Sequence, residues 1–149
     1  MNEMHARLKV MKNEQAIKTY GNLRSMFKKL IKTIELSVAY EANYHGIQII
    51  TCEDTSFSML FFDRINVVAR FSGMTNEADG TMYGRIAFEQ EGKSCRTYYF
   101  DEQGKVFDEI GKNYDGVIDS VQQVDNLLSE VTHELIRGGI AFESFAFIK

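Results

Sequence analysis

Three arginines and two tyrosines on neighbouring predicted strands are the residues in this sequence best suited to hold a ligand. The guanidinium group of arginine presents a planar fork of N–H donors that matches carboxylate or phosphate, and tyrosine rings can flank such anions. Beside an apolar surface, these side chains would suit an amphipathic acid whose charged head lies on the arginines. The predicted ligand-binding residues are Arg70, Tyr83, Arg85, Arg96 and Tyr98.

The same residues also have a structural interpretation. Arg85 would stack on Tyr98, and Arg96 would pair with Glu89 or Asp108. In that arrangement the arginines serve the sheet or a subunit contact, and they hold no ligand.

Four apolar side chains adjoin this group on the same predicted face of the sheet. A contiguous apolar patch marks a contact or a ligand site, because monomeric proteins rarely leave one exposed to water. A two-fold dimer would bury the patch by placing the same face on both subunits. The predicted interface residues are Phe57, Met59, Phe61 and Val68.

The remaining candidates for chemistry have simpler explanations. Glu130-x-x-His133 has the spacing of half a di-iron site, but the second motif is missing, so we interpret it as a solvated helix face. Cys52 and Cys95 have no CxxC neighbour and are interpreted as small buried hydrophobic residues. The chain also contains no GxGxxG, P-loop, HExxH or GxSxG motif. We therefore predict no catalytic residue, no metal and no cofactor.

Two helical segments are expected to flank the strands that carry these residues. Residues 3–42 have apolar side chains every three or four positions, and Gly21-Asn22 interrupts them, which predicts one long bent helix or two. Residues 117–137 show the same period and are followed by Gly138, a typical residue at a helix end.

Between the two helical segments the apolar period changes to two. Turn residues separate six short runs, which predicts consecutive antiparallel hairpins, a meander. The tail from 140 to 149 is apolar and is expected to dock on the body. The six runs are 46–52, 57–62, 65–72, 81–90, 94–101 and 105–110.

Turn lengths determine which strand residues share a face of the sheet. With a two-residue turn at Asp63-Arg64, Leu60 lies opposite Val67, and with a two- or four-residue turn around Glu91-Gly92, Arg85 lies opposite Tyr98. This register places the ligand-binding and interface residues on the face that points away from the helices. The predicted core face then carries Ile47, Ile49, Leu60, Phe62, Ile65, Val67, Ala69, Phe71, Met82, Ile86, Phe88, Cys95 and Tyr99.

Length and composition are typical of one soluble globular domain over residues 1–149. Apolar residues make up 44% and charged residues 26% of the chain, and no apolar run is long enough to span a membrane. The expected fold is α+β, with an N-terminal helix or helices, a six-stranded antiparallel meander and a long C-terminal helix. Two strand cysteines and no signal segment favour the cytoplasm.

The charge is distributed unevenly along the chain. Residues 1–40 hold eight Lys/Arg and three Glu, a balance of +5, whereas residues 41–149 hold nine Lys/Arg and eighteen Asp/Glu, a balance of −9. A basic N-terminal helix on an acidic body could touch nucleic acid or an anionic membrane. However, only Arg24, Lys28 and Lys32 fall on one helical stripe. We therefore expect this helix to complement the acidic body, in the same chain or across a dimer, with neither nucleic acid nor membrane as partner.

Two functions are compatible with these observations. The first is a non-enzymatic interaction module that forms a homodimer through the mixed apolar and Arg/Tyr face of the sheet. The second is a small-ligand domain, enzymatic or not, that holds an amphipathic anionic molecule on that face. We favour the first, because no histidine lies in the strands to supply acid–base chemistry. The curvature of the sheet discriminates between them, since a strongly bent sheet encloses a cavity and a flatter one offers an interface.

Overall fold

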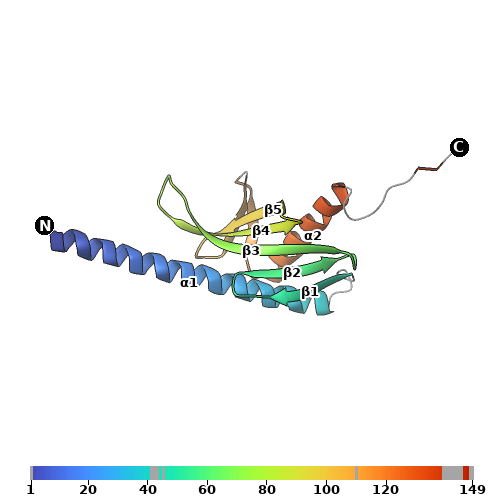
Figure 1. Ribbon diagram of the computed structural model, residues 1–149, viewed down its shortest axis with the longest axis horizontal. Helices are drawn as coiled ribbons and strands as arrows, with labels where there is room; N and C mark the ends of the chain where they lie inside the picture. The colour runs from blue at the N-terminus through green and yellow to red at the C-terminus, as the bar shows by residue number, and fades with distance from the viewer. Residues whose placement is uncertain (1, 41–43, 45, 110, 139–145, 148–149) are drawn as a thin grey trace.

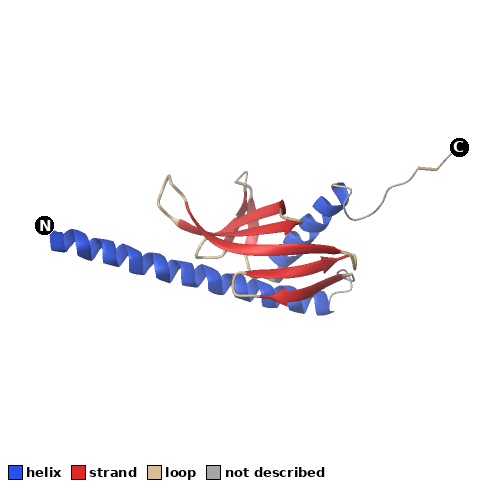
Figure 2. Ribbon diagram, viewed as in Figure 1, coloured by secondary structure: helices blue, strands red, loops and turns tan. Residues whose placement is uncertain are grey.

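A long helix, a meandering antiparallel sheet and a second helix follow one another along the chain (Figure 1, Figure 2). The computed structural model describes residues 2–40, 44, 46–109, 111–138 and 146–147, with residues 2–12 as helix backbone alone. The predicted α+β class is confirmed. The elements are α1 (Asn2–Tyr40), β1 (Ile47–Cys52), β2 (Ser56–Phe61), β3 (Ile65–Thr75), β4 (Met82–Gln90), β5 (Lys93–Phe100), β6 (Lys105–Asp108), β7 (Asn113–Val117) and α2 (Val121–Arg137).

The sheet is a meander in which every strand pairs with its sequence neighbours, in the order β1 to β7. It has seven strands, one more than the six predicted runs. The additional strand β7 has the sequence Asn-Tyr-Asp-Gly-Val, in which Tyr114 alone is buried. A strand with one buried side chain shows no alternation of apolar and polar residues, so periodicity did not reveal it.

Helix α1 is a single helix of 39 residues. Gly21 does not break it, and a methyl group added at Gly21 would meet no atom within 4 Å. One stripe of the helix, from Leu23 to Ile34, packs under the sheet with fully buried side chains at Phe27 and Leu30. The N-terminal half of α1 extends beyond the sheet (Figure 1).

Helix α2 begins after Ser120, whose side-chain oxygen accepts a hydrogen bond from the backbone N–H of Gln123. This capping bond satisfies one of the donors that a helix start leaves free. The helix lies against β5, β7 and α1. Its buried apolar stripe consists of Val124, Leu127, Leu128, Val131 and Leu135.

The hydrophobic core lies between the two helices and one face of the sheet, which we call the inner face. The opposite face is called the outer face. β3 bends along its length, and the hairpin that it forms with β4 rises away from α1 (Figure 1). The buried apolar residues of the inner face are Phe57, Met59, Phe61, Ile65, Val67, Ala69, Phe71, Ile86, Phe88, Tyr98, Phe100 and Val106.

The predicted register of β2 is wrong by one residue. Phe61 pairs with Ile65, so the turn contains three residues, and two of them, Phe62 and Asp63, have left-handed backbones with φ of 56° and 58°. Because side chains alternate between faces, this one-residue difference turns the whole strand over. The predicted interface residues Phe57, Met59 and Phe61 are therefore core residues, at most 1% exposed.

The predicted register of β5 is also wrong by one residue. The two-residue turn at Glu91-Gly92 is present, but β5 has a bulge at Cys95, opposite Phe88 and Glu89, which shifts the pairing of the residues that follow. Tyr98 therefore lies opposite Ile86, not opposite Arg85. A bulge places two residues opposite one, which reverses the faces of all residues that follow.

The predicted docking of residues 140–149 falls outside the described residues, apart from Ala146 and Phe147, which are exposed. Among the described helices, none is both long enough and apolar enough to cross a membrane.

Candidate functional site

The five predicted ligand-binding residues divide between the two faces of the sheet. Alternation along β3 and β4 places Arg70, Tyr83 and Arg85 on the outer face. Arg96 and Tyr98 lie on the inner face, because a bulge at Cys95 turns the rest of β5 over. Of the four predicted interface residues, Val68 alone lies on the outer face, where it is half-buried.

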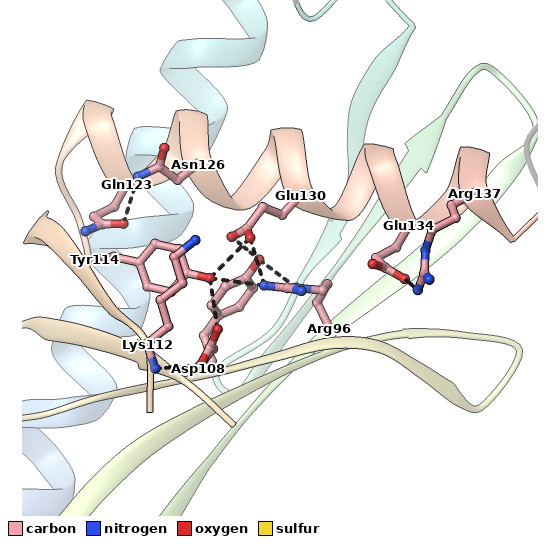
Figure 3. Close-up of polar contacts among 10 residues, drawn as sticks. Arg96, Asp108, Lys112, Tyr114, Gln123, Asn126, Glu130, Glu134 and Arg137 are labelled. Atoms are coloured by element: carbon pink, nitrogen blue, oxygen red, sulfur yellow. Dashed lines mark hydrogen bonds and ion pairs between the residues drawn. The ribbon is translucent and has the colours of Figure 1, made fainter. Parts of the chain in front are cut away.

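Arg96 and Tyr98 belong to a hydrogen-bonded cluster beneath α2, which we call the Glu130 network (Figure 3). One carboxylate oxygen of Glu130 accepts from Nη2 of Arg96 at 2.8 Å, and the other accepts from the hydroxyl of Tyr98 at 3.0 Å. The hydroxyl of Tyr114 donates to Glu130 at 3.2 Å and lies 3.4 Å from Asp108. The network therefore joins β5, β6, β7 and α2 at one point.

The Glu130 network is internally satisfied. Both oxygens of Glu130 accept hydrogen bonds, and Arg96 donates to two tyrosine hydroxyls as well as to the carboxylate. Burial raises the pKa of Tyr98, and burial together with Glu130 raises the pKa of Tyr114 to about 12. Both phenols thus stay protonated far above neutral pH, whereas a catalytic base works best with a pKa near the operating pH. These contacts indicate a structural role for the Glu130 network, which holds α2 on the sheet.

A pocket of about 370 Å³ adjoins the Glu130 network, but its cations already have partners. Arg96 is paired with Glu130, and Arg137 is paired with Glu134 at 2.6 Å. Burial raises the pKa of the Cys95 thiol in the same pocket, which disfavours the reactive thiolate. This pocket therefore offers neither a free cation nor an activated nucleophile.

Aromatic side chains gather on the outer face, at the end of the sheet that carries the β3–β4 hairpin. The ring of Phe107 packs edge-on against Tyr83 at 5.4 Å and stacks on Tyr99 at 5.6 Å between centroids. Above these rings lies a pocket of about 320 Å³, which we call the outer-face pocket. It is lined by Met74, Thr75, Asn76, Tyr83, Tyr99, Phe107, Asp108, Glu109 and Gly111.

Arg85 lies next to the outer-face pocket in the sheet. It pairs with Tyr99 across the β4–β5 ladder and is two residues from Tyr83 on the same strand face. Its side chain is half-buried, yet it forms no hydrogen bond or ion pair with another described residue. Arg70, on the same face, is more exposed and lies 3.6 Å from the carboxylate of Glu89. Arg85 is thus a half-buried arginine of this face that has no carboxylate partner within the described part of the chain.

Sequence reasoning missed several residues of both clusters. The predicted register of β5 places Tyr99 in the core, and this register is wrong. Phe107 is not among the residues predicted for either site. Glu130 was interpreted as solvated together with His133, but the two differ: His133 is exposed, whereas Glu130 faces the sheet. The described residues contain no cluster of His, Cys, Asp and Glu that could hold a metal ion.

Comparisons with known proteins found no matching family model, no similar curated protein and no similar solved structure.

Proposed function

We propose that the chain is a binding module that holds a small amphipathic anion on the outer face of its sheet. The apolar body of the ligand lies in the outer-face pocket on the rings of Tyr83, Tyr99 and Phe107. Its anionic group lies against Arg85. The observation that carries this proposal is the half-buried residue Arg85, which has no hydrogen-bond or ion-pair partner among the described residues and lies beside Tyr83 and Tyr99 of the aromatic pocket.

Physical arguments on shape and charge support this assignment. A volume of about 320 Å³ is at the small end of the range for ligand pockets, which suits a small molecule better than a peptide. Aromatic rings supply large apolar contact areas, and an arginine forms charge-assisted hydrogen bonds about twice as strong as neutral ones. β3 bends along its length (Figure 1), and residues at its hairpin end, Met74, Thr75 and Asn76, line the pocket.

A pair of probes of opposite charge tests the proposal by titration calorimetry. Naphthalene sulfonate should bind, and naphthyl methylammonium, which has the same ring system with a cationic group, should bind at least tenfold more weakly. Arg85→Met should weaken sulfonate binding by about 10- to 100-fold, because a hydrogen bond to a charged group contributes about 1.5–3 kcal/mol. Arg70→Met is the matched control, since Arg70 lies on the same face but already pairs with Glu89.

Two results would overturn the proposal. One is binding of the ammonium probe as tightly as the sulfonate probe. The acidic residues Asp108 and Glu109 would then determine which ligand charge the pocket accepts. The other is equal sulfonate binding by wild type and Arg85→Met. Phe107→Ala distinguishes binding in the pocket from binding elsewhere, because it removes the central ring of the site and should weaken both probes.

We also propose a cytoplasmic location. Both cysteines are free, with Cys52 exposed and Cys95 half-buried, and a reducing compartment keeps such thiols reduced.

A further inference from the structure

The N-terminal part of α1 has no packing partner along its described side chains. Residues 13–18 are exposed on every side of the helix, and Ile17 is 72% exposed. Thr19 is the first residue of this stretch that is buried. We call residues 2–18 the α1 arm, and Figure 1 shows it projecting from the sheet. An isolated helix of this length is only marginally stable in water, so a stable arm needs a surface to pack on.

The sequence of the α1 arm combines apolar spacing with positive charge. Met4, Leu8 and Met11 recur every three or four residues, which is the spacing of one helix stripe. The arm also carries Arg7, Lys9, Lys12 and Lys18 against Glu3 and Glu14, a balance of +2. A surface that receives the arm should therefore be partly apolar and acidic.

Such a surface begins where the arm leaves the body. A groove of about 590 Å³ separates the base of the arm from the β3–β4 hairpin, and we call it the hairpin groove. Asp79 and Glu102 supply its charge, and none of its lining residues is basic. It is lined by Gln15, Ala16, Thr19, Thr75, Asp79, Gly80, Thr81, Met82 and Glu102.

Both acids of the hairpin groove are held in place within the chain. Glu102 accepts hydrogen bonds from the side chains of Thr19 and Asn22, each at 3.3 Å. Asp79 accepts from the backbone N–H of Thr81 at 2.8 Å, and this bond lowers the pKa of its carboxyl. The groove therefore presents two carboxylates in fixed positions.

We propose that two copies of this chain associate about a two-fold axis, with the α1 arm of each copy lying in the hairpin groove of the other. The groove lies at the base of the arm, so two antiparallel arms that cross near residues 13–18 reach both grooves at once. This contact is self-complementary, as a two-fold interface requires. Charge favours it as well, because the arm is basic, whereas residues 41–149 carry a balance of −9. The dimer is independent of the small-ligand site on the outer face.

Sedimentation velocity on the full chain at micromolar concentrations tests the dimer. Wild type should sediment with twice the mass of the 17.1 kDa chain. Ile17→Glu should weaken self-association at least tenfold, because it places a charge at the crossing of the arms. Leu36→Glu is the matched control, since Leu36 is 60% exposed on the packed half of the same helix and should leave the dimer intact.

Exchanging the charges of the α1 arm and the hairpin groove tests whether the arm of a second copy occupies the groove. The double variants Lys9→Glu/Lys12→Glu and Asp79→Asn/Glu102→Lys should each dissociate, because arm and groove then carry charge of the same sign. An equal mixture of the two should recover the dimer, since each arm then meets a groove of opposite sign. Circular dichroism of each variant shows that the fold is retained.

Three outcomes would overturn the proposal. The first is a wild-type monomer at every concentration. The second is a dimer that withstands Ile17→Glu and both charge variants. The third is a monomer that binds anionic lipid vesicles or duplex DNA through the arm, which would make an anionic surface the partner in place of a second copy.

Discussion

Glu130→Ala removes the residue on which the polar contacts beneath α2 converge. In wild type its carboxylate accepts hydrogen bonds from Arg96, Tyr98 and Tyr114. Truncation leaves the hydroxyl of Tyr98, which is 0% exposed, without its acceptor. Tyr114 keeps its contact with Asp108 at 3.4 Å. The substitution therefore creates one buried unsatisfied donor and one cation without its carboxylate.

The expected loss of unfolding free energy is about 3 kcal/mol. A buried donor left without a partner costs about 1–3 kcal/mol. Breaking a fully buried ion pair costs about 3–5 kcal/mol, but the side chains of Arg96 and Glu130 are 25% and 27% exposed. Water that reaches the freed guanidinium lowers this second contribution to about 1–2 kcal/mol. Glu130→Gln keeps an acceptor for Tyr98 and should lose less, about 1–2 kcal/mol.

Urea denaturation followed by circular dichroism measures this loss as a shift of the midpoint at unchanged slope. Glu134→Ala is the control, since it removes an ion pair with Arg137, which is 68% exposed, from the same helix, and it should cost less than about 1 kcal/mol. Tyr98→Phe combined with Glu130→Ala should be clearly non-additive, because both substitutions remove the same hydrogen bond. Equal losses for Glu130→Ala and Glu134→Ala, or strict additivity with Tyr98→Phe, would refute the structural role of the Glu130 network.

Three further predictions concern close packing, the continuity of α1 and pH. Gly84→Ala should destabilise the fold by about 2–3 kcal/mol in thermal unfolding, because its Cβ would lie 2.3 Å from the ring of Phe100. Gly21→Ala should instead stabilise by about 0.5–1 kcal/mol, since the added methyl group meets no atom within 4 Å, and a loss there would contradict a continuous α1. Burial and Glu130 raise the pKa of Tyr114 to about 12, against about 10 for an unfolded tyrosine. The protonated hydroxyl of Tyr114 therefore contributes fully to stability below about pH 10, and this contribution is lost as the pH rises towards 12. The urea midpoint of wild type should fall between these two pH values. The midpoint of Tyr114→Phe should fall less over the same range.

The kinds of element and their order could be predicted from the sequence. Apolar spacing of three and four predicts α1 and α2, and a change to alternation predicts the strands between them, because a buried face imposes its period on the residues that form it. The turn at Glu91-Gly92 was also predicted, and both residues have the left-handed backbone that a two-residue hairpin turn requires. These are local properties, and the residues that decide them are adjacent in the chain.

The faces of the strands, and with them the site, were decided only by the tertiary structure. Phe62 adopts a left-handed backbone although it is not glycine, and the resulting three-residue turn places Phe57, Met59 and Phe61 on the inner face, in the hydrophobic core. The bulge at Cys95 in β5 likewise contains no glycine that would indicate it in the sequence. Alternation along a strand looks the same in either register, and only packing against the helices selects which set of side chains is buried. For that reason the sequence alone determined the α+β meander, whereas the separation of Arg85 from Arg96 and Tyr98 depended on contacts between residues far apart in the chain.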